Sequence, residues 1–149
     1  VTGETTATGK NRVDWVMERQ DVDIFVLELG ANDGLRGIPV AETERNLKAI
    51  IAKVRRHHPQ IEIILAGMMV PPNMGEEYSE EFQAVFPKAT KEEGVELIPF
   101  LLKDVAGEPD LNLEDGIHPN KQGHRIVAST IWEYLEPVIM DKMESGDFD

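Results

Sequence analysis

Two short apolar runs, each followed by a glycine, constrain the fold of this chain more than any other feature. Residues 23–29 precede Gly30, and residues 61–66 precede Gly67. Runs of this length that are apolar at nearly every position are typical of strands covered on both faces, as in a parallel sheet. The sequence therefore predicts buried parallel strands with helices packed against them.

Helical patterns alternate with these strands. Apolar residues in 42–57 recur at helical spacing, and Pro59 follows the last turn. Weaker patterns predict further helices over residues 13–20, 76–93 and 121–135 and a third strand over residues 95–98. Pro87 is expected to kink or divide the second of these helices. The alternation predicts an α/β domain with a parallel sheet and helices on both faces. We expect a single domain over residues 1–149 with a frayed acidic tail over 140–149.

The charge of the chain narrows its class of partner. The 28 acidic side chains outnumber the 15 basic ones, so the formal net charge is -13. This sign argues against nucleic acid or an anionic membrane surface as the main partner. No run approaches the roughly 20 apolar residues of a membrane-spanning helix, so no transmembrane segment is predicted. The chain has no cysteine, and its histidines lack zinc-ligand spacing, so we predict no metal site.

Asp115 and His118 form the strongest candidate for chemistry. They are separated by Gly116 and Ile117 and followed by Pro119, so a single turn can point both side chains into the same space. Asp115 can then accept a hydrogen bond from one ring nitrogen of His118, which leaves the other nitrogen free as a base. The same residues can also form a surface turn in which the aspartate accepts only local backbone hydrogen bonds.

Three stretches are expected to meet at one edge of the sheet. Loops at Asn32 and Met68 follow the ends of the first two predicted strands, and the Asp115–His118 pair lies in the long connection after the third. In open parallel sheets, ligands bind beyond the carboxyl ends of the strands. The sequence therefore predicts one cleft formed by all three stretches.

The motifs in these stretches resemble those of the SGNH (GDSL-type) serine hydrolases. The similarity is greatest to the branch of thioesterase I, lysophospholipase and arylesterase. Four stretches match this branch in the family's order, namely residues 2–6, 27–37, 70–75 and 115–120. The resemblance implies a flavodoxin-like three-layer α/β/α sandwich.

The resemblance also assigns roles residue by residue. Asp115 and His118 match the acid and base of the catalytic triad. Gly3 matches a glycine whose backbone N–H is one oxyanion donor, and the side-chain amide of Asn32 matches another. Asp33, which follows it, is interpreted as loop support rather than as a reacting group.

A further set of residues would border the substrate. By the resemblance, the loop around Val70 lies beside the acyl chain, so Met69, Val70, Pro71 and Ile117 are the candidate substrate contacts. The methionines of this loop suit an acyl pocket, because thioethers are flexible and apolar. Simple packing of the loop explains them equally well.

The nucleophile of such a triad is not visible in this chain. Its three serines are Ser79 in an acidic helical segment, Ser129 in the last predicted helix and Ser145 in the tail. None follows a strand in a glycine-rich turn, and the family's Gly-Asp-Ser-Leu block would precede residue 1. We therefore expect an N-terminally incomplete domain that lacks a strand–helix–strand unit. The strand at residues 24–29 would then have a bare edge.

These observations predict a serine ester hydrolase whose substrates are small to medium acyl esters or thioesters, with no cofactor. A carbohydrate O-deacetylase of the same family is an alternative, although the apolar loop favours acyl chains. A non-catalytic binding domain that has lost the nucleophile is another. The resemblance favours a periplasmic or secreted location, and the sequence leaves the oligomeric state open.

Overall fold

The structure is a computed structural model that describes residues 3–146. It divides into two compact units, Val1–Pro99 and Phe100–Asp149, and each is described by itself. The N-terminal unit contains, in order, α1 (Thr6–Arg19), β1 (Ile24–Leu27), α2 (Ala31–Leu35), α3 (Val40–His57), β2 (Glu62–Ala66), a 3-10 turn η1 (Pro72–Met74), α4 (Glu76–Glu93) and β3 (Glu96–Ile98). The C-terminal unit contains a 3-10 turn η2 (Pro109–Leu111) and α5 (Lys121–Ser145). The predicted single domain stays a prediction.

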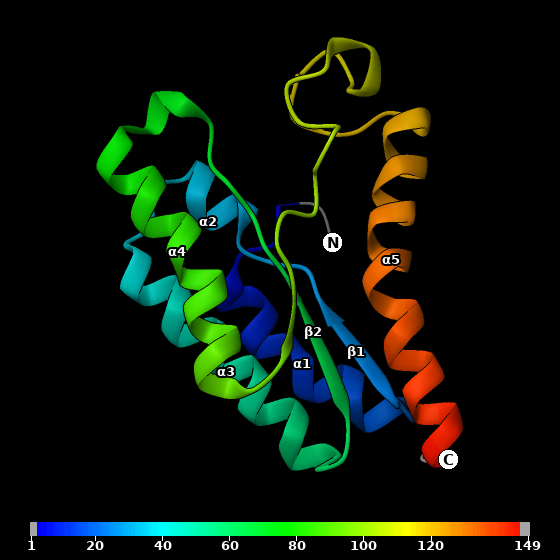
Figure 1. Ribbon diagram of the computed structural model, residues 1–149. Helices are drawn as coiled ribbons and strands as arrows, with labels where there is room; N and C mark the ends of the chain where they lie inside the picture. Colours follow the sequence, from blue (N-terminus) through cyan, green and yellow to red (C-terminus); the bar gives the residue numbers. More distant parts are fainter. Residues whose placement is uncertain (1–2, 147–149) are drawn as a thin grey trace. The chain divides into compact units, whose positions relative to one another are not determined.

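The sheet has the parallel arrangement that the apolar runs predict. Its order is β1-β2-β3, and both pairs of neighbours are parallel. Val26 is in register with Ile64, and Leu65 with Leu97. The carboxyl ends of all three strands therefore lie at the same edge of the sheet, as Figure 1 shows for β1 and β2.

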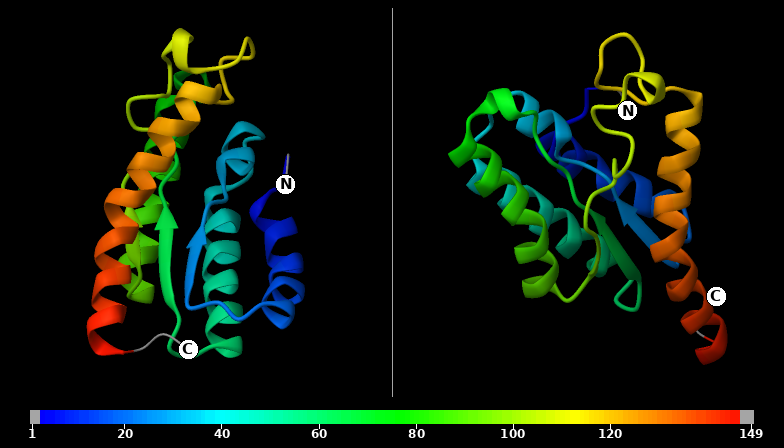
Figure 2. Two further views of the ribbon diagram at one scale, coloured as in Figure 1. Left: turned by 90° about the vertical axis from the view of Figure 1, so that its right-hand side faces the viewer. Right: turned by 45° about the horizontal axis from the view of Figure 1, so that its top comes forward.

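Helices α1, α3 and α4 form a layer in which α3 lies between the other two (Figures 1 and 2). The apolar stripe of α3 predicted from the sequence faces the core. The most completely buried large apolar side chains of the N-terminal unit come from α3, α4, β2 and β3, and are Leu47, Ile50, Ile51, Val54, Ile64, Leu65, Phe82, Phe86 and Ile98. Burying each large apolar side chain contributes about 1.5–3 kcal/mol, so this core holds the strand ends in place.

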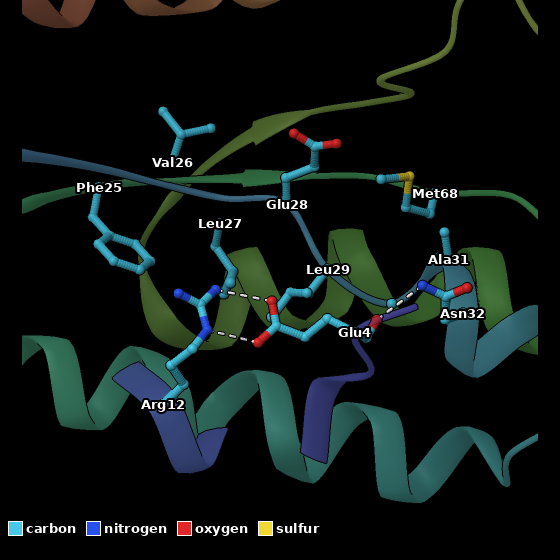
Figure 3. A pocket seen from close by; sticks show the side chains of 11 residues that line it. Glu4, Arg12, Phe25, Val26, Leu27, Glu28, Leu29, Ala31, Asn32 and Met68 are labelled. Carbon is cyan, nitrogen blue, oxygen red and sulfur yellow. Dashed lines mark hydrogen bonds and ion pairs between the residues drawn. The ribbon is translucent and has the colours of Figure 1, made fainter. Parts of the chain in front are cut away.

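Strand β1 is an edge strand within the described residues, since it pairs with β2 alone. A pocket is lined by the consecutive residues 25–32, together with Glu4, Arg12 and Met68 (Figure 3). Phe25 and Leu27 point to one side of β1 and Val26 to the other. Because the pocket contacts residues of both strand faces, it lies along the edge of β1 that β2 leaves unpaired. The predicted bare edge is therefore present.

Several predicted element boundaries are wrong. The first helix begins at Thr6, where Thr5 and Thr8 form a capping box, and not at residue 13. Part of the predicted glycine-rich loop after β1 is the short helix α2. Pro87 does not divide α4, which is assigned as one helix over Glu76–Glu93. A proline removes only one backbone donor, and the fully buried Phe82 and Phe86 hold the helix on its N-terminal side.

The last helix also differs from its prediction. It continues ten residues beyond position 135, to Ser145, so residues 140–145 are helical and not frayed. It ends where Gly146 adopts a left-handed conformation with φ of 73° and donates its backbone N–H to Lys142. Residues 147–149 of the predicted tail, and Thr2 of the first motif, lie outside the described residues. None of the helices described in residues 3–146 is long and apolar enough to span a membrane.

Candidate active site

The hydrogen bond predicted between Asp115 and His118 is confirmed. In the C-terminal unit, Nδ1 of His118 lies 2.6 Å from Oδ2 of Asp115. The other carboxylate oxygen accepts the backbone N–H groups of Ile117 at 2.9 Å and His118 at 3.0 Å. Gly116 completes the turn with φ of 68°, a conformation that a residue with a side chain adopts only under strain.

The carboxylate fixes the tautomer of the histidine. An ionised carboxylate only accepts hydrogen bonds, so Nδ1 must carry the proton and Nε2 of the neutral ring is the basic nitrogen. Nε2 has no partner among residues 3–146. The His118 side chain is 61% exposed and that of Asp115 is 43% exposed, so both are open to a reactant.

The three hydrogen bonds also change the acidity of Asp115. The His118 side chain, followed by the N–H groups of His118 and Ile117, lowers the pKa of Asp115 from 3.8 to about 2. Asp115 is therefore ionised at any pH at which an esterase would be assayed. It holds the imidazole and would stabilise an imidazolium formed during proton transfer.

Backbone contacts hold this turn against the start of α5. A bridge joins Asn112 to Pro119, and the N–H of Leu113 donates to the carbonyl of His118 at 2.8 Å. Asn120 then caps α5 by accepting the N–H of Gly123 at 3.0 Å. The capped start of α5 therefore lies only two residues after His118, which limits the motion of the histidine backbone.

The two predicted oxyanion donors lie close together in the N-terminal unit. The side-chain amide of Asn32 in α2 donates to the carbonyl of Glu4 at 3.0 Å (Figure 3). The preceding residue, Gly3, is exposed with φ of 75°, and its carbonyl accepts from Arg36 at 3.2 Å. A carboxamide has two N–H donors, so the hydrogen bond to Glu4 leaves one of them for a ligand.

Arg12 neutralises the carboxylate of Glu4, which lines the pocket along β1 beside these donors. Its guanidinium makes two hydrogen bonds to Glu4, at 2.8 and 2.9 Å, and this contact lowers the pKa of Glu4. Figure 3 shows this ion pair next to the hydrogen bond between Asn32 and the Glu4 carbonyl. The pairing offsets a negative charge that would otherwise oppose an oxyanion nearby.

The substrate loop packs against the Asn32 segment through Gly34. A side chain at position 34 would place its Cβ 2.3 Å from Cγ1 of Val70 and 3.0 Å from the ring of Phe82, so only glycine fits. Met69 is 42% exposed, Pro71 is exposed, and Val70 is half-buried. The structure thus brings two of the three predicted loops together. The fourth candidate contact, Ile117, is 46% exposed on the turn of the C-terminal unit.

Sequence reasoning missed several residues that support these loops. Thr6, Thr43 and Asn46 surround the buried carboxylate of Asp33, and the hydroxyl of Tyr78 donates to the carbonyl of Ile38 at 2.6 Å. Their partners lie far away in the sequence, so no local pattern indicates them. The one signal that the sequence offers is that Thr6 and Thr43 share the helical spacing of the apolar residues that α1 and α3 bury.

None of the three serines occupies a nucleophile turn. Ser79 lies in the first turn of α4 and donates its hydroxyl to the carbonyl of Gly75 at 2.7 Å. Ser129 lies inside α5, and Ser145 at its end donates to Lys142. The expectation that no serine of this chain follows a strand in a tight turn is confirmed.

Comparison with known proteins agrees with these features. Residues 1–126 match the model of the GDSL-like lipase/acylhydrolase family. The thioesterase 1/protease 1/lysophospholipase L1 of Escherichia coli (strain K12) is 33% identical over 93% of this chain. The arylesterase of Vibrio mimicus is 32% identical over 91% of it. The chain spans 66% of the length of each of these two relatives.

Solved structures show the same fold. The psychrotrophic esterase EstA from Pseudoalteromonas sp., in a structure inhibited by monoethylphosphonate, has a TM-score of 0.86 and 31% identity. That match covers 92% of this chain and 74% of EstA. The predicted α/β fold of the SGNH hydrolases and the resemblance to their thioesterase and arylesterase branch are thereby confirmed. The chain belongs to the GDSL-like lipase/acylhydrolase family.

Proposed function

We propose that the protein hydrolyses esters or thioesters of small to medium acyl groups by a Ser-His-Asp mechanism. The observation that carries this proposal is the hydrogen bond from Nδ1 of His118 to the ionised Asp115, in a histidine side chain that is 61% exposed. In this mechanism Nε2 takes the proton of a serine hydroxyl as its oxygen attacks the acyl carbon. His118 then gives that proton to the leaving alcohol or thiol, and water hydrolyses the acyl-enzyme by the same steps.

The second N–H of Asn32 and the backbone N–H of Gly3 would stabilise the tetrahedral intermediate. Both lie at the carboxyl end of β1, and the amide of Asn32 is already oriented by the Glu4 carbonyl. Fixed donors at a developing oxyanion are each worth about 2.7–4 kcal/mol of the barrier. The exposed Met69 and the half-buried Val70 provide apolar surface for an acyl chain beside these donors.

The serine would come from a strand that pairs with the free edge of β1. The pocket along this edge ends at Asn32, so a turn after a parallel strand there would place its hydroxyl near the amide. The family resemblance favours the same location for the Gly-Asp-Ser-Leu block. In this proposal the nucleophile is none of the three serines in residues 1–149.

A fluorophosphonate probe tests the proposal, because it labels only activated serines. The probe is applied to the 149-residue chain and to the protein expressed from its complete coding sequence, and labelled peptides are mapped. We expect no label on the 149-residue chain, and label on one further serine together with turnover of a short-chain nitrophenyl ester in the complete protein. Label on Ser79, Ser129 or Ser145 would contradict the proposed site. Absence of label and turnover in the complete protein would favour a non-catalytic binding domain.

A further inference from the structure

We infer that the buried carboxylate of Asp33 is a positioning residue that orients both proposed oxyanion donors. The inference deepens the proposed function and rests on it for the roles of Gly3 and Asn32. Asp33 is 1% exposed, and its carboxylate accepts hydrogen bonds from Thr6 and Thr43. Its effect on the reaction would therefore pass through the residues that it holds.

The carboxylate joins the starts of two helices to α2. Oδ1 of Asp33 accepts the backbone N–H of Thr6 at 2.8 Å, and Oδ2 accepts the hydroxyls of Thr6 at 2.5 Å and Thr43 at 2.8 Å. Asn46 donates to the Thr6 hydroxyl at 3.1 Å. Hydrogen bonds to a buried charge are stronger than neutral ones, so this contact fixes the position of Thr6 relative to α2.

Three side chains of α2 and its C-cap hold the segment that carries Gly3. Asp33 holds the N–H of Thr6, Asn32 holds the carbonyl of Glu4 at 3.0 Å, and Arg36 holds the carbonyl of Gly3 at 3.2 Å. The contact from Arg36 is exposed and that from Asn32 is only partly buried, whereas the contact from Asp33 is buried. Asp33 is therefore the anchor of the three.

The hydrogen bond from Thr6 to Asp33 affects both oxyanion donors, because the residues involved are close together in the chain. Asn32 and Asp33 are adjacent, and their partners Glu4 and Thr6 are two residues apart, so the two hydrogen bonds close a small ring between the segments. If the bond to Thr6 weakens, the carbonyl of Glu4 can move away from the amide of Asn32. The free N–H of Asn32 and the N–H of Gly3 would then lose their common direction, and preorganisation of such donors is what lowers the barrier.

The substitution Asp33→Asn tests this inference, because the carboxamide keeps the shape but presents one acceptor oxygen instead of two. Thr6→Val is a second, milder variant that keeps the backbone contact to Oδ1 but removes the hydroxyl contacts to Oδ2 and to Asn46. Val54→Ala serves as the control, because Val54 is fully buried but lies 11 residues after Thr43, about 16 Å along α3. It lowers stability without contacting either donor segment.

The first readout is the NMR signal of the two side-chain amide protons of Asn32 in the 149-residue chain. Their chemical shifts and their rate of exchange with water are measured. We expect slowed exchange and two separate resonances in the wild-type chain and in Val54→Ala. In Asp33→Asn the exchange should accelerate by about 10-fold, with a smaller change in Thr6→Val. Unchanged Asn32 resonances in Asp33→Asn would overturn the inference. If that variant does not fold, an unchanged Asn32 signal in Thr6→Val would overturn it.

The second readout is ester hydrolysis by the complete protein. We expect kcat to fall about 10- to 100-fold in Asp33→Asn with KM changed less than threefold, and kcat to be retained in Val54→Ala. Equal loss of kcat in both variants would mean that Asp33 only stabilises the fold, and would overturn the inference. If the wild-type complete protein has no activity but the Asn32 amide signals change as expected in Asp33→Asn, the proposed function is wrong. The positioning of Asn32 by Asp33 is then still supported.

Discussion

The Asp115–His118 turn and the Asn32–Asp33 segment hold their polar groups in opposite ways. Every hydrogen bond that shapes Asp115 comes from residues two or three positions away, and both side chains are exposed. Asp33 is almost fully buried, and its partners lie 10 and 27 positions away. The geometry of the Asp115–His118 turn therefore depends on local contacts, whereas that of the Asn32–Asp33 segment depends on the packing of three helices.

The largest expected difference between the two regions is in stability. Asp33→Ala leaves the Thr6 N–H and two hydroxyls buried without their acceptor, and each such group costs about 1–3 kcal/mol. We expect the free energy of unfolding to fall by about 3 kcal/mol or more, measured by urea denaturation of the 149-residue chain. Asp115→Ala is the matched variant, because it also removes a carboxylate with three hydrogen bonds. A comparable fall in the free energy of unfolding of Asp115→Ala would contradict the stated difference between the two regions.

The contact between the Val70 loop and α2 should give the next largest effect. In Gly34→Ala the new methyl group would overlap Val70, and overpacking of this kind costs about 1–3 kcal/mol. The double variant Gly34→Ala with Val70→Ala should recover part of the loss, since it removes the overlapping methyl groups. The recovery is measured by comparing the denaturation midpoints of the single and double variants. Additive losses would show that the two loops do not touch as described.

Tyr78→Phe is expected to have a smaller effect in the N-terminal unit. The substitution removes the hydrogen bond to the Ile38 carbonyl at 2.6 Å but keeps the ring stacked near Phe82. The loss should be about 0.5–1.5 kcal/mol in the free energy of unfolding, as for a typical hydrogen bond. Burial raises the pKa of Tyr78, so ultraviolet titration should show it ionising above the usual range for tyrosine. Ionisation at pH 10 would show that the ring is not held in this position.

The smallest expected effect on stability comes from protonation of the Asp115 carboxylate in the turn. Because the pKa of Asp115 is lowered from 3.8 to about 2, its hydrogen bonds stabilise the turn above pH 3.8, and this contribution is lost as the pH falls through about 2. NMR titration of the Asp115 carboxyl carbon checks this value. In His118→Ala the midpoint should move upward, because the largest cause of the shift is removed. A midpoint near 3.8 in the wild-type chain would show that the turn is open.

The contrast also explains what the sequence could predict. The hydrogen bond between Asp115 and His118 was predictable because the partners are three residues apart and a glycine and a proline limit the turn. The stripe of α3 follows from a periodic pattern, and the two longer strands follow from nearly continuous apolar runs. The full set of partners around Asp33 was not predictable, since Thr6 and Thr43 meet it only after α1 and α3 have packed. The extra length of α5 was not predicted, because Pro137 stands just after position 135 and proline is unfavourable inside a helix.

The central claim is that His118 is the base of an ester hydrolase, and the complete protein tests it most directly. The kcat/KM for a short-chain ester is measured for the wild type, for His118→Ala and for His124→Ala, an exposed histidine in the first turn of α5. We expect His118→Ala to lose about 10⁴-fold or more, as when a triad member is removed, and His124→Ala to retain the wild-type value. Retention of activity in His118→Ala would contradict the account.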